Sequence, residues 1–465
     1  MELLVRLVRA LLVFGVILAD YLVFLGLRKP LRRWVKNPET GREEPTMPAW
    51  LERYEVRLHE RNAKRLLRGM LRLRGVYIKL GQVLSMMGGF LPVVYGKELE
   101  QLQDAVPPQP FSGIEKALRE ELGEKYGTAL AEVDPTPLAS ASLGQVHVGR
   151  DASGQKLAVK VLYPGIRDVI RVDMRVIRLA VRVYRFFVPI GNIESVHHSL
   201  VDLLRRETDY LHEAACMRRM AANFAGQADV VCPAPIDELT TRDVLTMTFM
   251  EGFKITDLDA MARAGISPSA VATRLSQVFY EMLFVHRFFH ADPHPGNFLV
   301  EPLGEGRYRL VILDFGAVTE ARESMIFGMV DVLRGFFEQN DALVMRGIER
   351  IGFVAVDGDR ELLERTVKVY FQKLLKLEAR TPGALMQASE KELESLADPE
   401  LERKELRALM RSVHYPDEWF YVERAAVLSF WLVARLDPHL DMAQVGFPYI
   451  LPLLSQSLAQ SSETP

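Results

Sequence analysis

The chain has 465 residues, a formal net charge of -3 and a hydrophobic fraction of 49%. This length and composition suit a two-lobed globular region with additions and exclude a generally disordered chain. The near-neutral charge excludes a generally basic nucleic-acid-binding protein, so nucleic acid is not an expected partner. The two cysteines, Cys216 and Cys232, fit no zinc spacing and indicate a reducing compartment without a disulfide framework.

The first predicted element is an apolar helix over residues 11–27, interrupted only by Asp20 and flanked by basic residues. A membrane-spanning helix needs about 20 apolar residues, and an acid inside one costs about 2.5 to 3.5 kcal/mol on insertion scales. The basic flanks favour a helix that lies in the interface or dips into it, with anionic lipid headgroups as partners. A helix docked on the protein's own core is the alternative. No small-residue cleavage site follows, which argues against a removed signal peptide.

Residues 37–49 are rich in Pro and Gly among charges and are predicted to form a linker. Residues 50–73 have the pattern of a charged, Arg-rich helix, which runs into the apolar stretch 76–85. Lys79 interrupts that stretch, and a Lys in apolar surroundings is costly unless it finds an acid. A surface Lys whose stem covers apolar neighbours is the alternative.

A small β region is predicted after a helix at 113–127 and a chain break at 135–137. The pattern over 138–148 is strand, small-residue loop, strand, and residues 156–162 alternate as a strand does. The strand at 156–162 carries Lys160, which matches the strand Lys that contacts phosphates in protein-kinase-like sites.

The loop at 139–144, between the two strands predicted over 138–148, occupies the place of a Gly-rich phosphate loop, but most of the expected glycines are Ala or Ser. Side chains there limit how closely backbone N–H groups approach a phosphate, so we expect altered nucleotide geometry or preference. The predicted nucleotide-binding residues are Ala139, Ser140, Ala141, Ser142, Gly144, Val146, Lys160 and the hinge residue Glu251.

Two long helices are predicted next, over 167–188 and 194–227. A helical period in the second places Asp209 and Glu213 on one face, four residues apart, with Glu207 on another side. Glu213 is the candidate partner of Lys160. A single acid on a helix is most often a solvated surface residue, so this pairing depends on the surrounding motifs.

Strands at 230–236 and 244–250 precede Glu251-Gly252-Phe253, where a hinge between the two lobes is expected. A helix at 270–287 then leads into the run from His290 to Asn297. An acid with an Asn five positions later, then an apolar strand ending in Asp-Phe-Gly, is the layout of protein-kinase-like sites, where Asp and Asn oxygens hold Mg²⁺ against ATP phosphates. In this layout Asn297 and Asp314 bind Mg²⁺, and Asp292 orients the attacking hydroxyl or water.

Two other chemistries fit this part of the sequence less well. His290 and His294 flank Asp292 and could belong to a metal site, but the prolines at 293 and 295 prevent a regular helix and no further ligand cluster is evident. Asn297 is explained only by the kinase-like layout. A P-loop is excluded because Gly96-Lys97 is followed by Glu and lacks the preceding glycine spacing.

Five ordered motifs together resemble the UbiB (AarF/ADCK) family of atypical protein-kinase-like proteins. The resemblance runs from residue 50 to the C-terminus. The motifs are Lys79-Leu80-Gly81-Gln82 (Lys-x-Gly-Gln), the Ala-rich loop 139–144, Glu207-Thr208-Asp209 (Glu-x-Asp), the catalytic loop 290–297 and Asp314-Phe315-Gly316. This resemblance implies an α+β, protein-kinase-like two-lobed fold with a small β-containing N-lobe, a helical C-lobe and family-specific N-terminal helices.

The resemblance also implies a partner for Lys79. In the family the Lys-x-Gly-Gln helix, here with Gly81 and Gln82, folds across the site as a lid, and its Lys meets the two acids that correspond to Glu207 and Asp209. Because that helix occupies the place of a kinase's protein substrate, protein phosphorylation in trans is disfavoured.

The domain prediction has five segments. They are a membrane-associating helix at 1–36, a linker at 37–49, a helical extension at 50–130, a kinase-like N-lobe with a helical insert at 131–252 and a helical C-lobe at 253–465.

The expected function is that of a membrane-associated ATPase or small-molecule or lipid kinase that uses ATP and Mg²⁺ and supports ubiquinone or other isoprenoid-lipid metabolism. The alternative is a nucleotide-sensing pseudokinase scaffold of a lipid-biosynthetic complex. Expected partners are anionic headgroups, prenyl lipids and quinone-biosynthesis proteins, with the catalytic part in the cytoplasm. The apolar N-terminal segment is not a family hallmark in this position, so the membrane prediction rests on this sequence alone.

Overall fold

A computed structural model gives the fold. It describes residues 2–31, 33–36, 43–86, 92–102, 108–187, 193–355, 358–365, 367, 413–414 and 416–462. The chain divides into two compact units, which are described separately: unit 1 is Met1–Tyr210 with Asp237–Thr246, and unit 2 is Leu211–Ile236 with Met247–Pro465. Residues 37–42 of the predicted linker and Val188 of the predicted helix lie outside the described residues.

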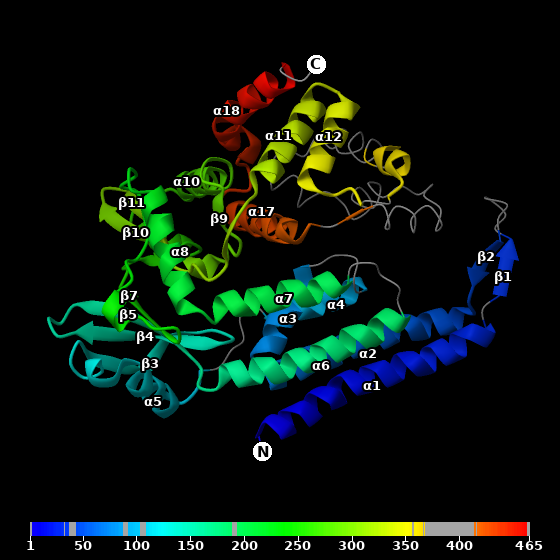
Figure 1. Cartoon of the computed structure of the whole chain (residues 1–465), viewed down its shortest axis with the longest axis horizontal. Helices are drawn as coiled ribbons and strands as arrows, with labels where there is room; N and C mark the ends of the chain where they lie inside the picture. Colours follow the sequence, from blue (N-terminus) through cyan, green and yellow to red (C-terminus); the bar gives the residue numbers. More distant parts are fainter. Residues whose placement is uncertain are drawn as a thin grey trace. The chain divides into compact units, whose positions relative to one another are not determined.

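Unit 1 is mainly helical in its first part (Figure 1). Its helices are α1 (Glu2–Leu31), α2 (Ala49–Leu73), α3 (Val76–Met86), α4 (Val93–Leu99), α5 (Phe111–Leu122), α6 (Ile166–Phe187) and α7 (Ile193–Glu207). Between α1 and α2 in the chain, β1 (Arg33–Lys36) pairs with β2 (Glu43–Thr46). Part of the predicted linker is therefore a strand, because it completes an antiparallel ladder with residues 33–36, and the predicted helix 1–36 ends at Leu31.

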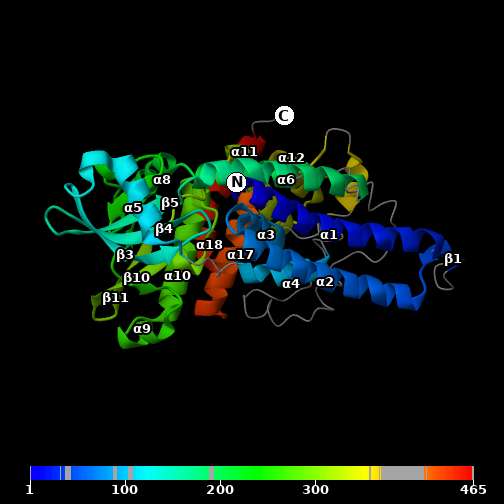
Figure 2. The ribbon, with the colours of Figure 1, turned by 90° about the horizontal axis from the view of Figure 1, so that it is seen from below.

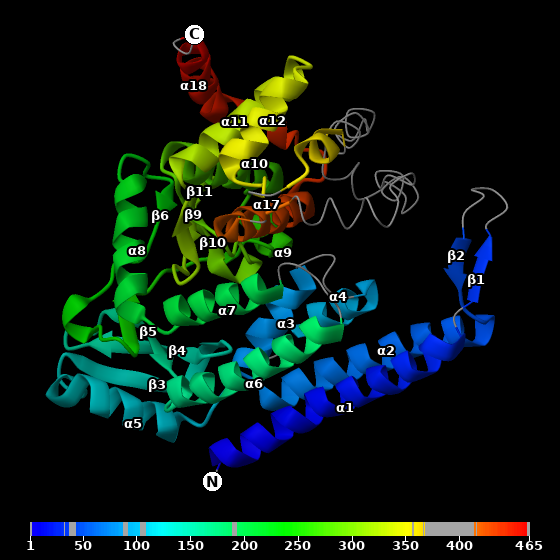
Figure 3. The same cartoon turned by 45° about the vertical axis from the view of Figure 1, so that its right-hand side comes forward.

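Helices α1 and α2 run side by side, with α6 alongside α1 (Figures 1, 2 and 3). Phe24 of α1 is buried together with Leu51 and Leu58 of α2. Val13 contacts α2 at Gly69, whose missing side chain lets the helices approach closely. The apolar N-terminal helix is thus docked on the helices of its own unit.

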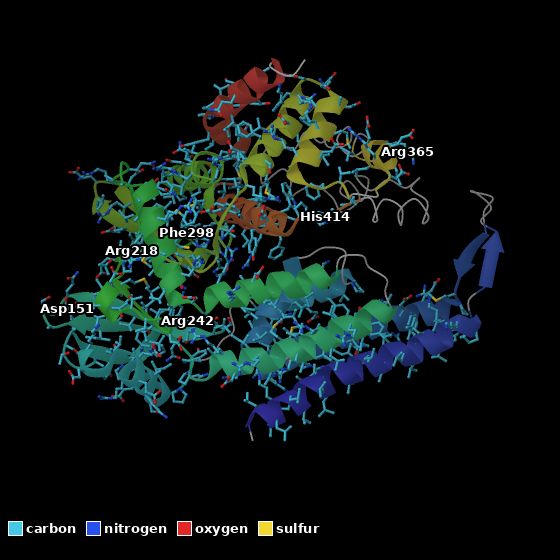
Figure 4. The ribbon with its side chains drawn as sticks, in the orientation of Figure 1. Asp151, Arg218, Arg242, Phe298, Arg365 and His414 are labelled. Carbon is cyan, nitrogen blue, oxygen red and sulfur yellow. The ribbon has the colours of Figure 1, made fainter. Side chains whose placement is uncertain are left out.

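The sheet of unit 1 has the strand order β3-β4-β5-β7. The strands are β3 (Leu130–Ser140), β4 (Gly144–Asp151), β5 (Lys156–Leu162) and β7 (Val244–Thr248). The predicted chain break at Pro135–Pro137 is wrong, since β3 continues through both prolines with register shifts around them. An edge strand tolerates proline because one side of its backbone needs no ladder partner. The β4–β5 turn is closed by Asp151, labelled in Figure 4, which accepts the N–H groups of Ser153 and Gln155 at 2.9 Å each.

The single helix predicted over 194–227 is wrong as well. Helix α7 ends at Glu207 and α8 (Tyr210–Asn223) begins after a break. The Thr208 hydroxyl donates to the Leu204 carbonyl at 2.7 Å. The Tyr210 N–H donates to the backbone carbonyl of Arg242 at 3.2 Å, which lies outside the helix. Asp209 and Glu213 therefore do not share a helical face, because the backbone changes direction between them.

Unit 2 contains α8 and the helical C-terminal part. Its strands are β6 (Val230–Val231), β8 (Phe253–Lys254), β9 (Phe288–His290), β10 (Phe298–Gly304), β11 (Arg307–Ile312) and β12 (Val318–Glu320). Its further helices are α9 (Leu258–Arg263), α10 (Pro268–Tyr280), α11 (Glu323–Phe337), α12 (Asp341–Ile351), α17 (Asp417–Leu436) and α18 (Met442–Ser462). The strand order is β6-β11-β10-β8, with β12 paired to β9. These short strands position the motif loops described next.

Candidate functional site

The catalytic loop follows β9, which ends at the fully buried His290. The Asp292 N–H donates to His290 Nδ1 at 3.0 Å. Burial lowers the pKa of His290, so the ring is neutral and its Nδ1 can accept this bond. His290 therefore holds the turn that presents Asp292 and is not placed as a metal ligand.

Asn297 is held by the same loop. Its side-chain amide N–H donates to the Asp292 carbonyl at 3.0 Å, so the amide oxygen is the atom left to bind a cation. The next residue, Phe298 (Figure 4), opens β10 and pairs with Ile312 of β11. The Leu313 N–H then donates to the Asn297 carbonyl at 2.9 Å. The β10–β11 hairpin thus places Asn297 beside Leu313, the residue that precedes Asp314.

Asp314 begins the turn after β11. Its carboxylate accepts the N–H of Gly316 at 3.1 Å, and Phe315 is fully buried beneath the turn. Glu213 of α8 is also buried, at 1% exposure, and its Oε1 lies 3.5 Å from the Phe315 N–H. Glu213 therefore supports the Asp314-Phe315-Gly316 turn from within unit 2. Its pairing with Lys160 stays a prediction.

The donor set of unit 2 suits Mg²⁺. An amide oxygen and a carboxylate are hard donors, and Mg²⁺ in proteins is commonly held by one or two such groups together with waters and substrate phosphates. Among the described residues, no group of three or more His, Cys, Asp or Glu side chains is arranged to hold a metal ion. An all-protein metal centre of the kind expected for the His290–His294 alternative is therefore not found in the described part of the chain.

Arg424 is the site residue that the sequence analysis missed. It lies on α17, is 6% exposed, and its Nη2 lies 2.8 Å from Asp292 Oδ1. The signal was present, because Arg424 follows Phe420 and Tyr421 by one helical turn on a buried face. A buried Arg requires an acidic partner, but the sequence does not say which acid that is.

In unit 1, Lys160 lies on β5 directly opposite Val146 of β4. Its Nζ is 5.2 Å from the centre of the Tyr210 ring, a cation–π distance. The strand Lys is thus oriented by an aromatic ring at the start of α8.

The Ala-rich loop joins β3 to β4 and is closed tightly. The Ala141 N–H donates to the Gly144 carbonyl at 2.8 Å, and the Tyr163 N–H donates to the Leu143 carbonyl at 2.9 Å. A side chain at Gly144 would collide with the Val161 carbonyl of β5. Gly144 therefore serves strand packing, and the nucleotide contacts of Ala139, Ser140, Ser142 and the exposed Glu251 of unit 2 stay predictions.

The ion pair expected between Lys79 and Glu207 is present, with Nζ and Oε1 2.5 Å apart and both side chains mostly buried. This pair ties α3 to α7, so the surface alternative for Lys79 is wrong. Asp209 lies 3.5 Å from Arg242, a residue labelled in Figure 4.

The other two lid residues also lie on α3. Gln82 donates to the Leu102 carbonyl at 3.3 Å. A side chain at Gly81 would meet Leu102 and Met70, which explains a glycine there. Both residues thus fasten α3 within unit 1.

A family model described as the ABC1 atypical kinase-like domain matches residues 101–347, more than half of the chain. The chain belongs to this atypical kinase-like family, and the resemblance to UbiB, AarF and ADCK proteins is confirmed. The α+β kinase-like fold class is confirmed with it.

Among named relatives, the chain is 29% identical over 413 residues to Protein ACTIVITY OF BC1 COMPLEX KINASE 8, chloroplastic, of Arabidopsis thaliana, covering 84% of this chain and 54% of that protein. It is 32% identical over 321 residues to AarF domain-containing protein kinase 1 of Xenopus laevis, covering 69% and 59%. The chain thus spans somewhat more than half the length of these relatives.

Among solved structures, the chain is similar to Rv3197 of Mycobacterium tuberculosis, solved in complex with erythromycin. The TM-score is 0.57 at 24% identity, and the match covers 87% of this chain and 99% of that one. This similarity concerns the fold.

Proposed function

We propose that the chain binds ATP with Mg²⁺ and transfers the γ-phosphoryl group to water or to a small or lipid-borne acceptor. The observation that carries the proposal is the arrangement in unit 2, where one loop and one hairpin hold Asp292, Asn297 and Asp314 through backbone hydrogen bonds. Phosphoryl transfer asks a protein mainly for positioning and charge neutralisation, which such a pre-formed set supplies.

The proposed roles follow from the chemistry of each group. Asn297 and Asp314 would hold Mg²⁺, which neutralises phosphate charge when bound. Asp292 would orient the acceptor hydroxyl or water and accept its proton, while the acceptor oxygen forms the new bond to phosphorus and the bond to ADP breaks. Lys160 would contact the α- and β-phosphates. The motifs occur along the chain in the order found in protein-kinase-like sites, which supports these proposed roles.

The proposed setting is a membrane surface where isoprenoid lipids such as ubiquinone are made, with the catalytic part in the cytoplasm. Helix α1 is long and apolar enough, over Leu3–Leu31, to cross a membrane by length and composition. An acceptor carried by the lipid phase would fit such a setting.

The test is phosphate release from ATP by purified protein, with and without vesicles that contain anionic lipid. We expect Asp314→Asn to reduce release at least roughly 100-fold, because removing one pre-organised group that stabilises transition-state charge costs at least about that much in other enzymes. Equal rates for wild type and Asp314→Asn, at matched thermal stability, would remove the proposal.

A second candidate is a nucleotide-sensing scaffold without required turnover. Two observations favour it: the Ala-rich loop is closed by its own backbone hydrogen bonds, and the Lys79–Glu207 pair fixes α3 to α7. Rescue of a quinone-deficient strain by folded Asp292→Asn would support the scaffold, and loss of rescue would support the enzyme. Labelling of other proteins in a lysate is not expected if the Lys79 helix occupies a protein-substrate site.

A further inference from the structure

Helices α1 and α2 enclose an apolar groove bordered by arginines. Leu12, Val13 and Val16 of α1 line it on one side. Gly69 forms part of its α2 side, where the bordering arginines are Arg65, Arg68 and Arg72. These arginines, with Arg61, recur at helical spacings of three and four, so they share one face of α2.

The arginines of this face are unequally neutralised. Asp20 of α1 pairs with Arg61 at 3.0 Å and also with Arg65. Within the described part of the chain, Arg68 and Arg72 have no acidic partner at ion-pair distance, and both are exposed. Two positive charges therefore border an apolar groove with no anion from the described residues.

The exposed side of α1 adjoins this groove and carries apolar side chains through the middle of the helix. Leu12 and Val16, which also line the groove, are 61% and 47% exposed, and Val23 is 59% exposed. Two charged side chains of α1 contact neighbouring helices: Arg6 pairs with the buried Asp173 of α6 at 2.6 Å, and Asp20 pairs with Arg61 of α2 at 3.0 Å. A spanning α1 would have to break both contacts and leave ions in hydrocarbon.

We infer that this groove binds one anionic phospholipid of a bilayer while α1, still docked on α2, lies in the plane of the membrane surface. Arg68 and Arg72 would hold the headgroup phosphate, for which the guanidinium fork is well suited. The acyl chains would lie along Leu12 and Val16. This inference rests on the membrane association proposed above and specifies its mode and its lipid class.

The first experiment measures flotation of the full chain with vesicles of phosphatidylcholine alone or mixed with phosphatidylglycerol, without nucleotide. Wild type should bind the anionic vesicles, and the double variant Arg68→Gln/Arg72→Gln should bind them roughly 30-fold more weakly, given the usual contribution of a basic residue at an anionic surface. The matched control is Arg263→Gln/Arg307→Gln, which removes the same charge from exposed positions of unit 2 and should bind as wild type.

Each contrary result has a clear meaning. Equal binding by the Arg68/Arg72 variant and wild type overturns the inference. If calorimetry detects binding of inorganic phosphate and no vesicles are bound, the arginines form a site for free phosphate, which overturns the inference of a phospholipid site. A dimer by light scattering that binds no vesicles assigns the face to a second copy. Because nucleotide is absent, failure of the phosphoryl-transfer proposal leaves these results unchanged.

The second experiment separates an in-plane helix from a spanning one. A Cβ atom at Gly69 would lie 3.4 Å from the Val13 Cβ, close to the separation in disulfides, so Val13→Cys/Gly69→Cys can lock α1 onto α2. The oxidised variant should bind anionic vesicles as well as its reduced form. Binding that is lost on oxidation and restored by reductant would mean that α1 must leave α2, and would overturn the inference.

Discussion

At the scale of single residues, the pair formed by Asp292 and Arg424 is the contact that changes the interpretation of the motif. The catalytic-loop motif predicted Asp292 as an acceptor-orienting acid, and the structure adds a buried guanidinium that holds one of its oxygens. The Arg424 Nε atom is buried with no hydrogen-bond partner among the described residues. Native proteins seldom keep such a donor unless it has a role, and here the ion pair supplies one.

We predict that Arg424→Met lowers the rate of phosphate release at least roughly 10-fold with a smaller change in the KM for ATP, because Asp292 loses the group that orients it. Arg424→Lys should restore part of the rate, since it keeps the charge but not the fork. Steady-state kinetics beside thermal unfolding measures both.

The control for this prediction is Arg322→Met. Arg322 precedes α11 and pairs with Glu418 of α17, the helix that also carries Arg424. Both side chains of this pair are exposed, so it contributes little to stability. Similar losses of rate in the Arg424 and Arg322 variants would contradict a role through Asp292.

At the scale of elements, helices α11 and α12 show how closely unit 2 is packed. A Cβ atom at Gly328 would lie 2.7 Å from the Gly347 carbonyl, and one at Gly347 would lie 2.6 Å from the Gly328 carbonyl. The two backbones therefore touch through reciprocal glycines, a contact that no side chain could replace.

We predict that Gly328→Ala destabilises the protein by roughly 1 to 3 kcal/mol, the usual cost of overpacking a close contact. Gly113→Ala is the matched control, because Gly113 lies within α5 with no atom in the way of a new methyl group. That change should instead stabilise by about 0.5 to 1 kcal/mol through helix propensity. Urea unfolding of wild type and the two variants measures these changes in stability. An unchanged unfolding midpoint for Gly328→Ala would contradict the close contact.

At the scale of the whole molecule, three histidines share one electrostatic property. Burial lowers the pKa values of His59 and His147 in unit 1 and of His290 in unit 2. For His147 burial outweighs the hydrogen bond that its Nδ1 donates to the Asp134 carbonyl at 2.7 Å, which by itself raises the pKa, and its Nε2 faces the Gln145 amide nitrogen at 2.8 Å. A second proton would place two donors against each other.

The folded state therefore resists protonation of these rings, whereas the unfolded chain takes up protons below pH 6.5. Their contribution to stability is present above that pH and is lost as pH falls below it, by at most about 1.4 kcal/mol per pH unit for each ring. We predict a lower free energy of unfolding at pH 5.5 than at pH 7.5.

The variant His147→Gln should narrow the difference in the free energy of unfolding between the two pH values, by at most about 1.4 kcal/mol, because a Gln takes up no proton in either state. The comparison between variants is needed since Asp173, whose pKa is raised by burial, acts in the opposite direction. An equal pH difference in wild type and His147→Gln would contradict the assignment.

Much of the candidate site could be predicted from the chain alone because its chemistry lies in short motifs. The spacing from Asp292 to Asn297 and the strand before Asp314 are local, and backbone geometry carries them into the fold. Arg424 could not be placed, because a buried Arg shows only that some acid must be near. The lid residues Lys79 and Glu207 needed the family resemblance for the same reason.

The sequence by itself determined the family, the strands that carry Lys160 and Asp314, and the apolar character of α1, since each depends on residue types at short spacing. Tertiary structure alone decided the break after Glu207, where the Tyr210 N–H finds a partner outside the helix. It also decided which way α1 faces, because the direction of Asp20 is set by arginines of another helix. The periodicity of a sequence predicts which residues share a face of one helix, whereas the partner of a charged side chain depends on the neighbouring helix against which that face packs.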